Sequence, residues 1–331
     1  MKHGRIVVAA LLLLAAAGAG ASTQLVVYTY DAFGEAIQKA IEAKFRSAYG
    51  VEVSFARFED TGGLYNRLFL ERDKPQADVA IGLDNTYLAR AYSDGLFQPY
   101  RPAGLEVVDA KLLVDPQYRL VPFDYGGVCL NVDTKALPNP PTSWEGLLDP
   151  SLRRKIILMS PATSSPGRNF LLLTIAVFGE DGYLDFWRKL KPNILTVAPG
   201  WSEGYGLYTQ GEAPIVLSYD TSPAYHIQFE NERRYQTLIL GDAAYAQVEV
   251  AGIVKGARNL ENARRLMDFL VSPEVQNLIP LNQLMYPVSP KADLPAAFRE
   301  VKRANELKSL DEQTVARSFD RWLRDWESVM R

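Results

Sequence analysis

Short runs of β-forming residues and longer stretches with helical spacing alternate along most of this chain. Residues 24–30 (QLVVYTY) and 77–83 are apolar runs of strand length, and residues 51–57 alternate apolar with small or polar side chains. Between the first two runs, Ile37, Ile41 and Phe45 recur on one helical face until Gly50. Further strands are predicted at residues 128–132, 155–159, 193–197, 213–218 and 247–254, and further helices at residues 64–69, 85–93, 169–178 and 260–271.

This alternation of strand and helix is typical of an α/β fold in which helices flank sheets of parallel type. A chain of this length exceeds what one hydrophobic core usually serves, which favours two lobes. We assign residues 22–120 and 224–331 to lobe 1 and residues 121–223 to lobe 2. The two crossings between the lobes, near residues 120 and 223, would then form a hinge beside a cleft.

The C-terminal region from Glu300 onward is predicted to be helical. Phe319, Trp322 and Trp326 lie on one face of that helix, which is the ordinary signature of a packing stripe. We expect the stripe to pack onto lobe 1.

Residues 1–21 have the features of a secretory signal peptide. Lys2 and Arg5 precede an apolar run at residues 6–17, and small residues follow it. The run is short for a membrane span. We therefore expect cleavage near residue 21 and export to the periplasm.

Composition narrows the function classes. The formal net charge of −3 becomes −5 when Lys2 and Arg5 leave with the signal peptide, and this mild acidity disfavours nucleic acids and anionic membranes as partners. Cys129 is the single cysteine, so no internal disulfide stabilises the exported chain.

Aromatic and hydroxyl side chains gather at or just beyond the carboxyl ends of the predicted strands, where ligands bind in open α/β sheets. Stacking rings, hydroxyls and carboxylates together suit a flat, positively charged organic ligand. We expect one binding site from Tyr30, Asp60, Thr61, Ser164, Ser165, Trp201, Tyr219, Asp220, Thr221, Ser222 and Tyr225.

Three of these positions have alternative interpretations. Asp60 could face a ligand cation, or it could cap the helix that follows it. Ser164 and Ser165 open a helix whose free N–H groups would favour an anion, and Arg168 in its first turn adds to that tendency. They could equally be an ordinary cap beside a solvated arginine.

Other classes of site are less favoured. The sequence GWSEG at residues 200–204 matches the nucleophile elbow of serine hydrolases, but the triad would need His226, with Asp220 close to it in the sequence. Paired histidine or cysteine ligands for zinc are absent, so we expect no metal, no cofactor and no enzymatic activity. A receptor for ferric iron, held by Tyr219 and Tyr225, or for a polyamine remains an alternative.

Several segments resemble the thiamine-binding periplasmic proteins of ABC importers. They are residues 27–33 (VYTYDAF), 77–85 (ADVAIGLDN), 121–126 (VPFDYG), 200–206 (GWSEGYG), 217–226 (LSYDTSPAYH) and 285–288 (MYPV). Three features depart from the family pattern. The loop after the first strand is shortened to residues 34–36 and lacks the tryptophan that the family has there, Leu284 stands where the family has another tryptophan, and Asp220 stands where it has a threonine.

The resemblance implies the two-lobe fold of type II periplasmic binding proteins. It also implies a monomer that binds thiamine or a thiamine phosphate and delivers it to an ABC transporter permease. By the same resemblance, Tyr30 and Tyr225 would stack on the ligand rings, and the other candidate residues named above would contact the ligand.

Overall fold

The structure is a computed structural model that describes residues 24–331, so the predicted signal peptide lies outside the described residues. The strands are β1 Gln24–Tyr30, β2 Glu52–Phe58, β3 Val79–Asp84, β4 Phe97–Gln98, β5 Val121–Asp133, β6 Ile156–Met159, β7 Ile194–Ala198, β8 Ile215–Tyr219, β9 Tyr235–Leu238, β10 Ala243–Val254, β11 Tyr286–Pro287 and β12 Glu306–Lys308. The helices are α1 Glu35–Tyr49, α2 Thr61–Leu70, α3 Leu88–Ser93, α4 Ser165–Leu190, α5 Trp201–Thr209, α6 Pro223–Glu230, α7 Leu260–Leu270, α8 Pro273–Gln276, α9 Ile279–Asn282, α10 Ala297–Glu300 and α11 Glu312–Met330.

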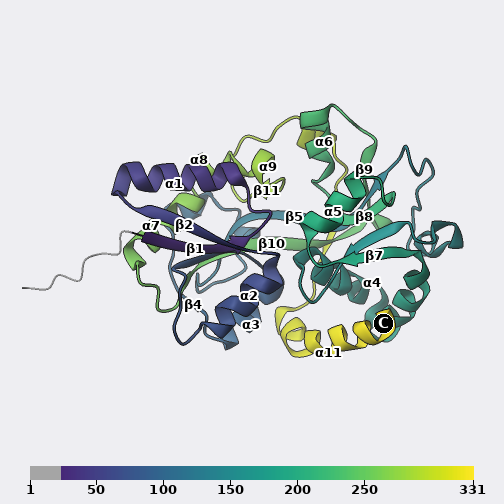
Figure 1. Ribbon diagram of the computed structural model, residues 1–331, viewed down its shortest axis with the longest axis horizontal. Helices are drawn as coiled ribbons and strands as arrows, with labels where there is room; N and C mark the ends of the chain where they lie inside the picture. Colours follow the sequence, from purple (N-terminus) through teal and green to yellow (C-terminus); the bar gives the residue numbers. More distant parts are fainter. Residues whose placement is uncertain (1–23) are drawn as a thin grey trace, which may run out of the picture.

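Two long strands, β5 and β10, connect the two halves of the molecule (Figure 1). The main path of the sheet is β2-β1-β3-β10-β5-β8-β6-β7. Strand β1 is parallel to β2 and β3, and β6 is parallel to β7 and β8. Strand β10 is antiparallel to β3 and β5, and β5 is antiparallel to β8. The predicted α/β fold is confirmed, and the antiparallel pair β5 and β10 joins its two parallel parts.

Each half has a hydrophobic core of its own. In the first half, Ile37 and Phe45 of α1 pack with Ile81 of β3. In the second half, Phe170 and Trp187 of α4 pack with the buried strand β6. Between residues 24 and 331, no helix has both the length and the apolar composition that crossing a membrane requires.

The chain passes between the halves through β5 and β10. Strand β5 begins at Val121, at the boundary predicted for lobe 2. After Ser222 the chain forms α6 and then β9, which pairs with the last residues of β5. The division into lobes at residues 121 and 223 stays a prediction.

The prediction for the C-terminal region was wrong about where the final helix begins and incomplete about what it packs against. The final helix, α11, begins at Glu312 rather than near Glu300, and the short strand β12 precedes it. Its aromatic stripe joins the core of the second half, where the Trp326 and Trp187 rings meet edge to face at 5.6 Å. The same helix also contacts α3 and the turn at residues 85–87 of the first half, so it packs onto both halves rather than onto lobe 1 alone. Periodicity identifies a buried face but carries no information about its partner.

Candidate ligand-binding site

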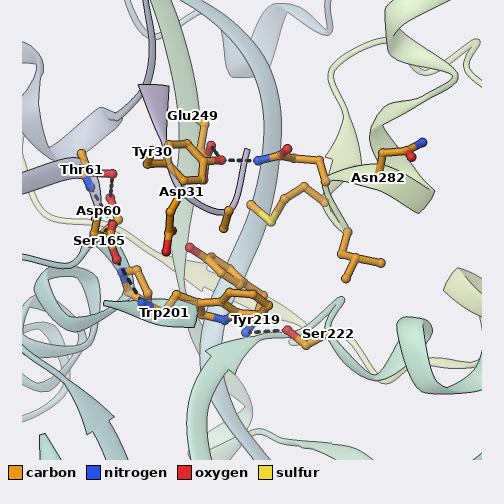
Figure 2. A pocket seen from close by; sticks show the side chains of 15 residues that line it. Tyr30, Asp31, Asp60, Thr61, Ser165, Trp201, Tyr219, Ser222, Glu249 and Asn282 are labelled. Atoms are coloured by element: carbon orange, nitrogen blue, oxygen red, sulfur yellow. Dashed lines mark hydrogen bonds between the residues drawn. The ribbon is translucent and has the colours of Figure 1, made fainter. Parts of the chain in front are cut away.

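A cavity lies where the ends of strands β1 and β8 meet the N-termini of three helices (Figure 2). Its lining comes from separate parts of the chain: Tyr30, Asp31 and Ala32 after β1, Asp60 and Thr61 at α2, Ser165 and Pro166 at α4, Trp201 at α5, Tyr219 and Ser222 around the end of β8, Glu249 in β10, and Asn282, Gln283, Leu284 and Met285 after α9.

The lining of this cavity, taken over residues 24–331, contains acidic side chains and no basic ones. Three carboxyl side chains line it: Asp31, Asp60 and Glu249. Within the described part of the chain, no lysine, arginine or histidine is among the lining residues. The cavity therefore suits a positively charged ligand.

Asp60 connects the N-termini of three helices. Its side chain caps α2 by accepting the Thr61 N–H at 2.7 Å. It also accepts the Ser165 N–H at the start of α4 (3.3 Å) and the Trp201 N–H at the start of α5 (3.2 Å). Burial raises the pKa of Asp60 to about 6, while these donors act in the opposite direction. The cap interpretation is confirmed, and the same carboxylate links the two halves.

Further hydrogen bonds join α2 and β3 to the loop before α4 and to its first residue. The Gly62 N–H donates to the Thr163 carbonyl at 3.0 Å. The Ser165 hydroxyl bonds both Asp84 and the Thr61 hydroxyl. The two halves thus touch directly on one side of the cavity.

Trp201 is held in place from two directions. Its ring stacks on that of Tyr205, with centroids 4.8 Å apart and planes 16° apart. Its indole N–H donates to the Ser218 hydroxyl at 2.8 Å, and Ser218 in turn bonds Ser222 at 2.7 Å. This fixed orientation presents an aromatic surface to the cavity.

Tyr30 and Glu249 form a polar group at another part of the wall. The Tyr30 hydroxyl donates to Glu249 at 2.6 Å and accepts from the Gln283 amide. Gln247 donates to Glu249 at 3.0 Å and to the Tyr219 hydroxyl at 2.9 Å. Burial raises the pKa of Glu249 to about 8.

Seven of the predicted site residues line this one cavity: Tyr30, Asp60, Thr61, Ser165, Trp201, Tyr219 and Ser222. The sequence argument placed them together because each lies at or just past the end of a strand. Their role in ligand binding stays a prediction.

Four predicted residues lie outside the lining of the cavity. Ser164 is fully buried at the N-cap of α4, and Thr221 is buried with its hydroxyl near the Met285 sulfur. Asp220 accepts the Gly127 N–H of β5 at 3.0 Å, so its carboxylate is used within the fold. The Tyr225 side chain is 39% exposed on α6, beside Phe229.

Sequence reasoning missed part of the lining. Glu249 lies within the run QVEVAGIV, where a charged residue inside an apolar strand is itself a signal of function. Asp31 directly follows Tyr30 at the strand end. Residues 282–285 carry no comparable signal, because only the folding of the chain brings their loop to the cavity.

The hydrolase interpretation requires a serine beside His226, and the structure gives that histidine other partners. His226 lies 3.0 Å from the Tyr205 hydroxyl and 2.7 Å from Glu230. Ser202 is exposed and lies near Asp31. The described residues also contain no group of three or more histidine, cysteine or acidic side chains placed to hold a metal ion.

Comparison with known proteins supports the resemblance seen in the sequence. Residues 74–314 match the family model described as bacterial extracellular solute-binding protein. The thiamine-binding periplasmic protein of Salmonella typhimurium is 38% identical, over 97% of both chains. Its counterpart in Escherichia coli is 37% identical, also over 97% of both. A solved periplasmic thiamin binding protein superposes with a TM-score of 0.85 at 35% identity, covering 93% of this chain and 96% of that one.

Proposed function

This chain belongs to the bacterial extracellular solute-binding proteins, and we propose that the solute it binds is thiamine or a thiamine phosphate. Proteins of this family bind small ligands and deliver them to a permease. The proposal extends to a monomeric receptor in the periplasm that binds a cation and carries out no reaction on it.

The observation that carries this proposal is the combination of charge and aromatic surface in the cavity. Tyr30, Trp201 and Tyr219 supply rings, and the carboxyl groups of the lining include Asp31 and Asp60, without a basic side chain among the lining residues that the structure describes. A thiazolium ring is flat and permanently positive, so it gains from both stacking and the negative field. An anionic ligand without a cationic ring would find no opposite charge there.

Closure of the two halves around the ligand is the second part of the proposal. The contacts of Asp60 with α4 and α5, and of Gly62 with Thr163, join segments that are far apart in the sequence. A ligand that touches both sides adds contacts only in the closed form, and therefore shifts the population toward it.

Calorimetry tests the proposal directly. Protein purified from the periplasmic fraction and freed of bound solute is titrated with thiamine, thiamine monophosphate, thiamine diphosphate, spermidine and ferric citrate. We expect saturable binding of at least one thiamine compound. That compound should be recovered from the complex chemically unchanged. Binding of spermidine or ferric iron in preference to all three thiamine compounds would overturn the assignment.

A further inference from the structure

Two buried acidic residues face each other on the strands that connect the halves. Asp124 of β5 and Glu249 of β10 are partners in the antiparallel register, so their side chains project from the same face of the sheet. Asp124 is completely buried and Glu249 is 6% exposed. Glu249 lines the cavity, so the pair lies at the candidate site.

The hydrogen bonds at this pair come from neutral groups. Glu249 accepts from the Tyr30 hydroxyl and the Gln247 amide. Neither carboxyl oxygen of Asp124 has a hydrogen-bond partner among the described residues. A buried carboxylate without donors is strongly disfavoured, and a second carboxylate beside it makes ionisation of both more unfavourable.

The other titratable groups that act on the pair are acidic. They are Tyr30 from β1, Tyr219 from β8, Asp84 at the end of β3 and Asp60 at the cap of α2. The buried guanidinium of Arg168 donates to Thr86 and lies over the rings of Tyr87 and Phe319. Burial, and then the charge of Glu249, raise the pKa of Asp124.

We propose that Asp124 and Glu249 together hold a proton in the ligand-free protein and release it when a permanently cationic ligand enters the cavity. The proton leaves a carboxyl O–H group for the solvent, and the positive charge of the ligand takes its place beside the resulting carboxylate. No other bond changes. This inference rests on the proposed function, because it needs a ligand whose charge cannot be lost.

Proton release has a measurable sign and size. The free protein holds a proton that the complex does not, so affinity increases as pH rises. With the pKa of Glu249 at about 8, binding at pH 7.5 should release about 0.8 proton, and affinity should fall about fivefold from pH 8 to pH 7. Asp60, with its pKa of about 6, is mostly ionised in that range and contributes little.

The experiment is calorimetric titration with thiamine at pH 7.5 in two buffers that differ in ionisation enthalpy. We expect proton release in the unmodified protein and in Asp31→Asn, which removes a carboxyl at the same cavity. In Glu249→Gln we expect weaker binding without proton release. Asp124→Asn should also lower the release, and it serves as the second variant if Glu249→Gln does not fold.

Three outcomes separate this inference from the proposed function. Thiamine binding with the same observed enthalpy in both buffers would overturn the inference and leave the function standing. Proton release that persists in both Glu249→Gln and Asp124→Asn would also overturn it. If thiamine does not bind, the proposed function fails, and infrared spectroscopy still tests the pair. The ligand-free protein at pH 7.5 should then show the C=O stretch of a protonated carboxyl group, which the double variant Asp124→Asn with Glu249→Gln removes, and absence of that band would refute the inference.

Discussion

Two adjacent glycines at the start of α2 allow closure to be tested with a matched pair of variants. A Cβ atom on Gly62 would lie 2.7 Å from the Thr163 carbonyl oxygen, 2.8 Å from the Thr163 Cα and 3.0 Å from the Ala162 oxygen. All three are backbone atoms of the other half, so no side chain can rotate to make room. A Cβ atom on Gly63 would meet only Phe58 Cβ, at an ordinary 3.6 Å.

The expected effect of Gly62→Ala follows from this geometry. Overpacking of a tight contact costs about 1–3 kcal/mol, and the clash arises only when the halves are together. A value of about 2 kcal/mol against closure corresponds to about a 30-fold loss of thiamine affinity. The same change replaces glycine by alanine within a helix, which favours the helix by about 1 kcal/mol.

Calorimetry with thiamine and urea unfolding measure the two effects separately. Gly63→Ala is the control, because it brings the same helical gain without the clash. We expect both variants to be at least as resistant to urea as the unmodified protein, with only Gly62→Ala binding thiamine weakly. Equal thiamine affinities for the two variants would show that α2 and the loop at Thr163 do not meet in the bound form.

Three further predictions concern single side chains of the cavity. Trp201→Ala removes a stacking surface and should weaken thiamine binding by at least about 1 kcal/mol, about fivefold; calorimetry showing unchanged affinity would remove Trp201 from the site. Asp60→Asn keeps the cap of α2, since asparagine caps as well as aspartate, but turns a donor toward an N–H group of Ser165 or Trp201. It should cost about tenfold in affinity while the urea midpoint moves little, and a large fall in that midpoint would assign Asp60 to stability instead. The pKa of Glu249 is higher in the folded chain than the usual 4.5, so unfolding releases its proton and the free energy of unfolding should fall by about 2 kcal/mol from pH 6 to pH 8. Urea titrations should show that fall, and Glu249→Gln should reduce it; equal slopes in both proteins would contradict the assignment.

The sequence predicted those parts of the fold that depend on local pattern. Strand β1 begins and ends where its run of β-formers does, and α7 follows its amphipathic spacing to within one residue. The failures concern the start of the final helix and the partners of its buried face. The stripe containing Phe319 and Trp326 was correctly assigned as buried, but it joins the core around α4 while the helix also contacts the first half, and that arrangement depends on the shape of the whole molecule.

In the candidate site, too, the sequence predicted some features and could not predict others. Residues at the ends of strands, such as Tyr30 and Tyr219, could be grouped because sheet topology brings strand ends together. Asp220 is also at a strand end, yet its carboxylate turns toward the Gly127 N–H. Neighbouring residues at a strand end point in different directions, so sequence position alone could not separate Tyr219 from Asp220.

The proposal for Asp124 and Glu249 is tested more strictly than a prediction for one residue. It requires stability and ligand affinity to change with pH in opposite directions. Folding buries Glu249 beside Asp124 and retains a proton, so stability should fall as pH rises through 8. Ligand binding expels that proton, so affinity should rise over the same range. A general loss of structure at high pH would lower both quantities together. Stability and affinity moving in opposite directions, and both changes shrinking in Glu249→Gln, would trace them to this one carboxyl group.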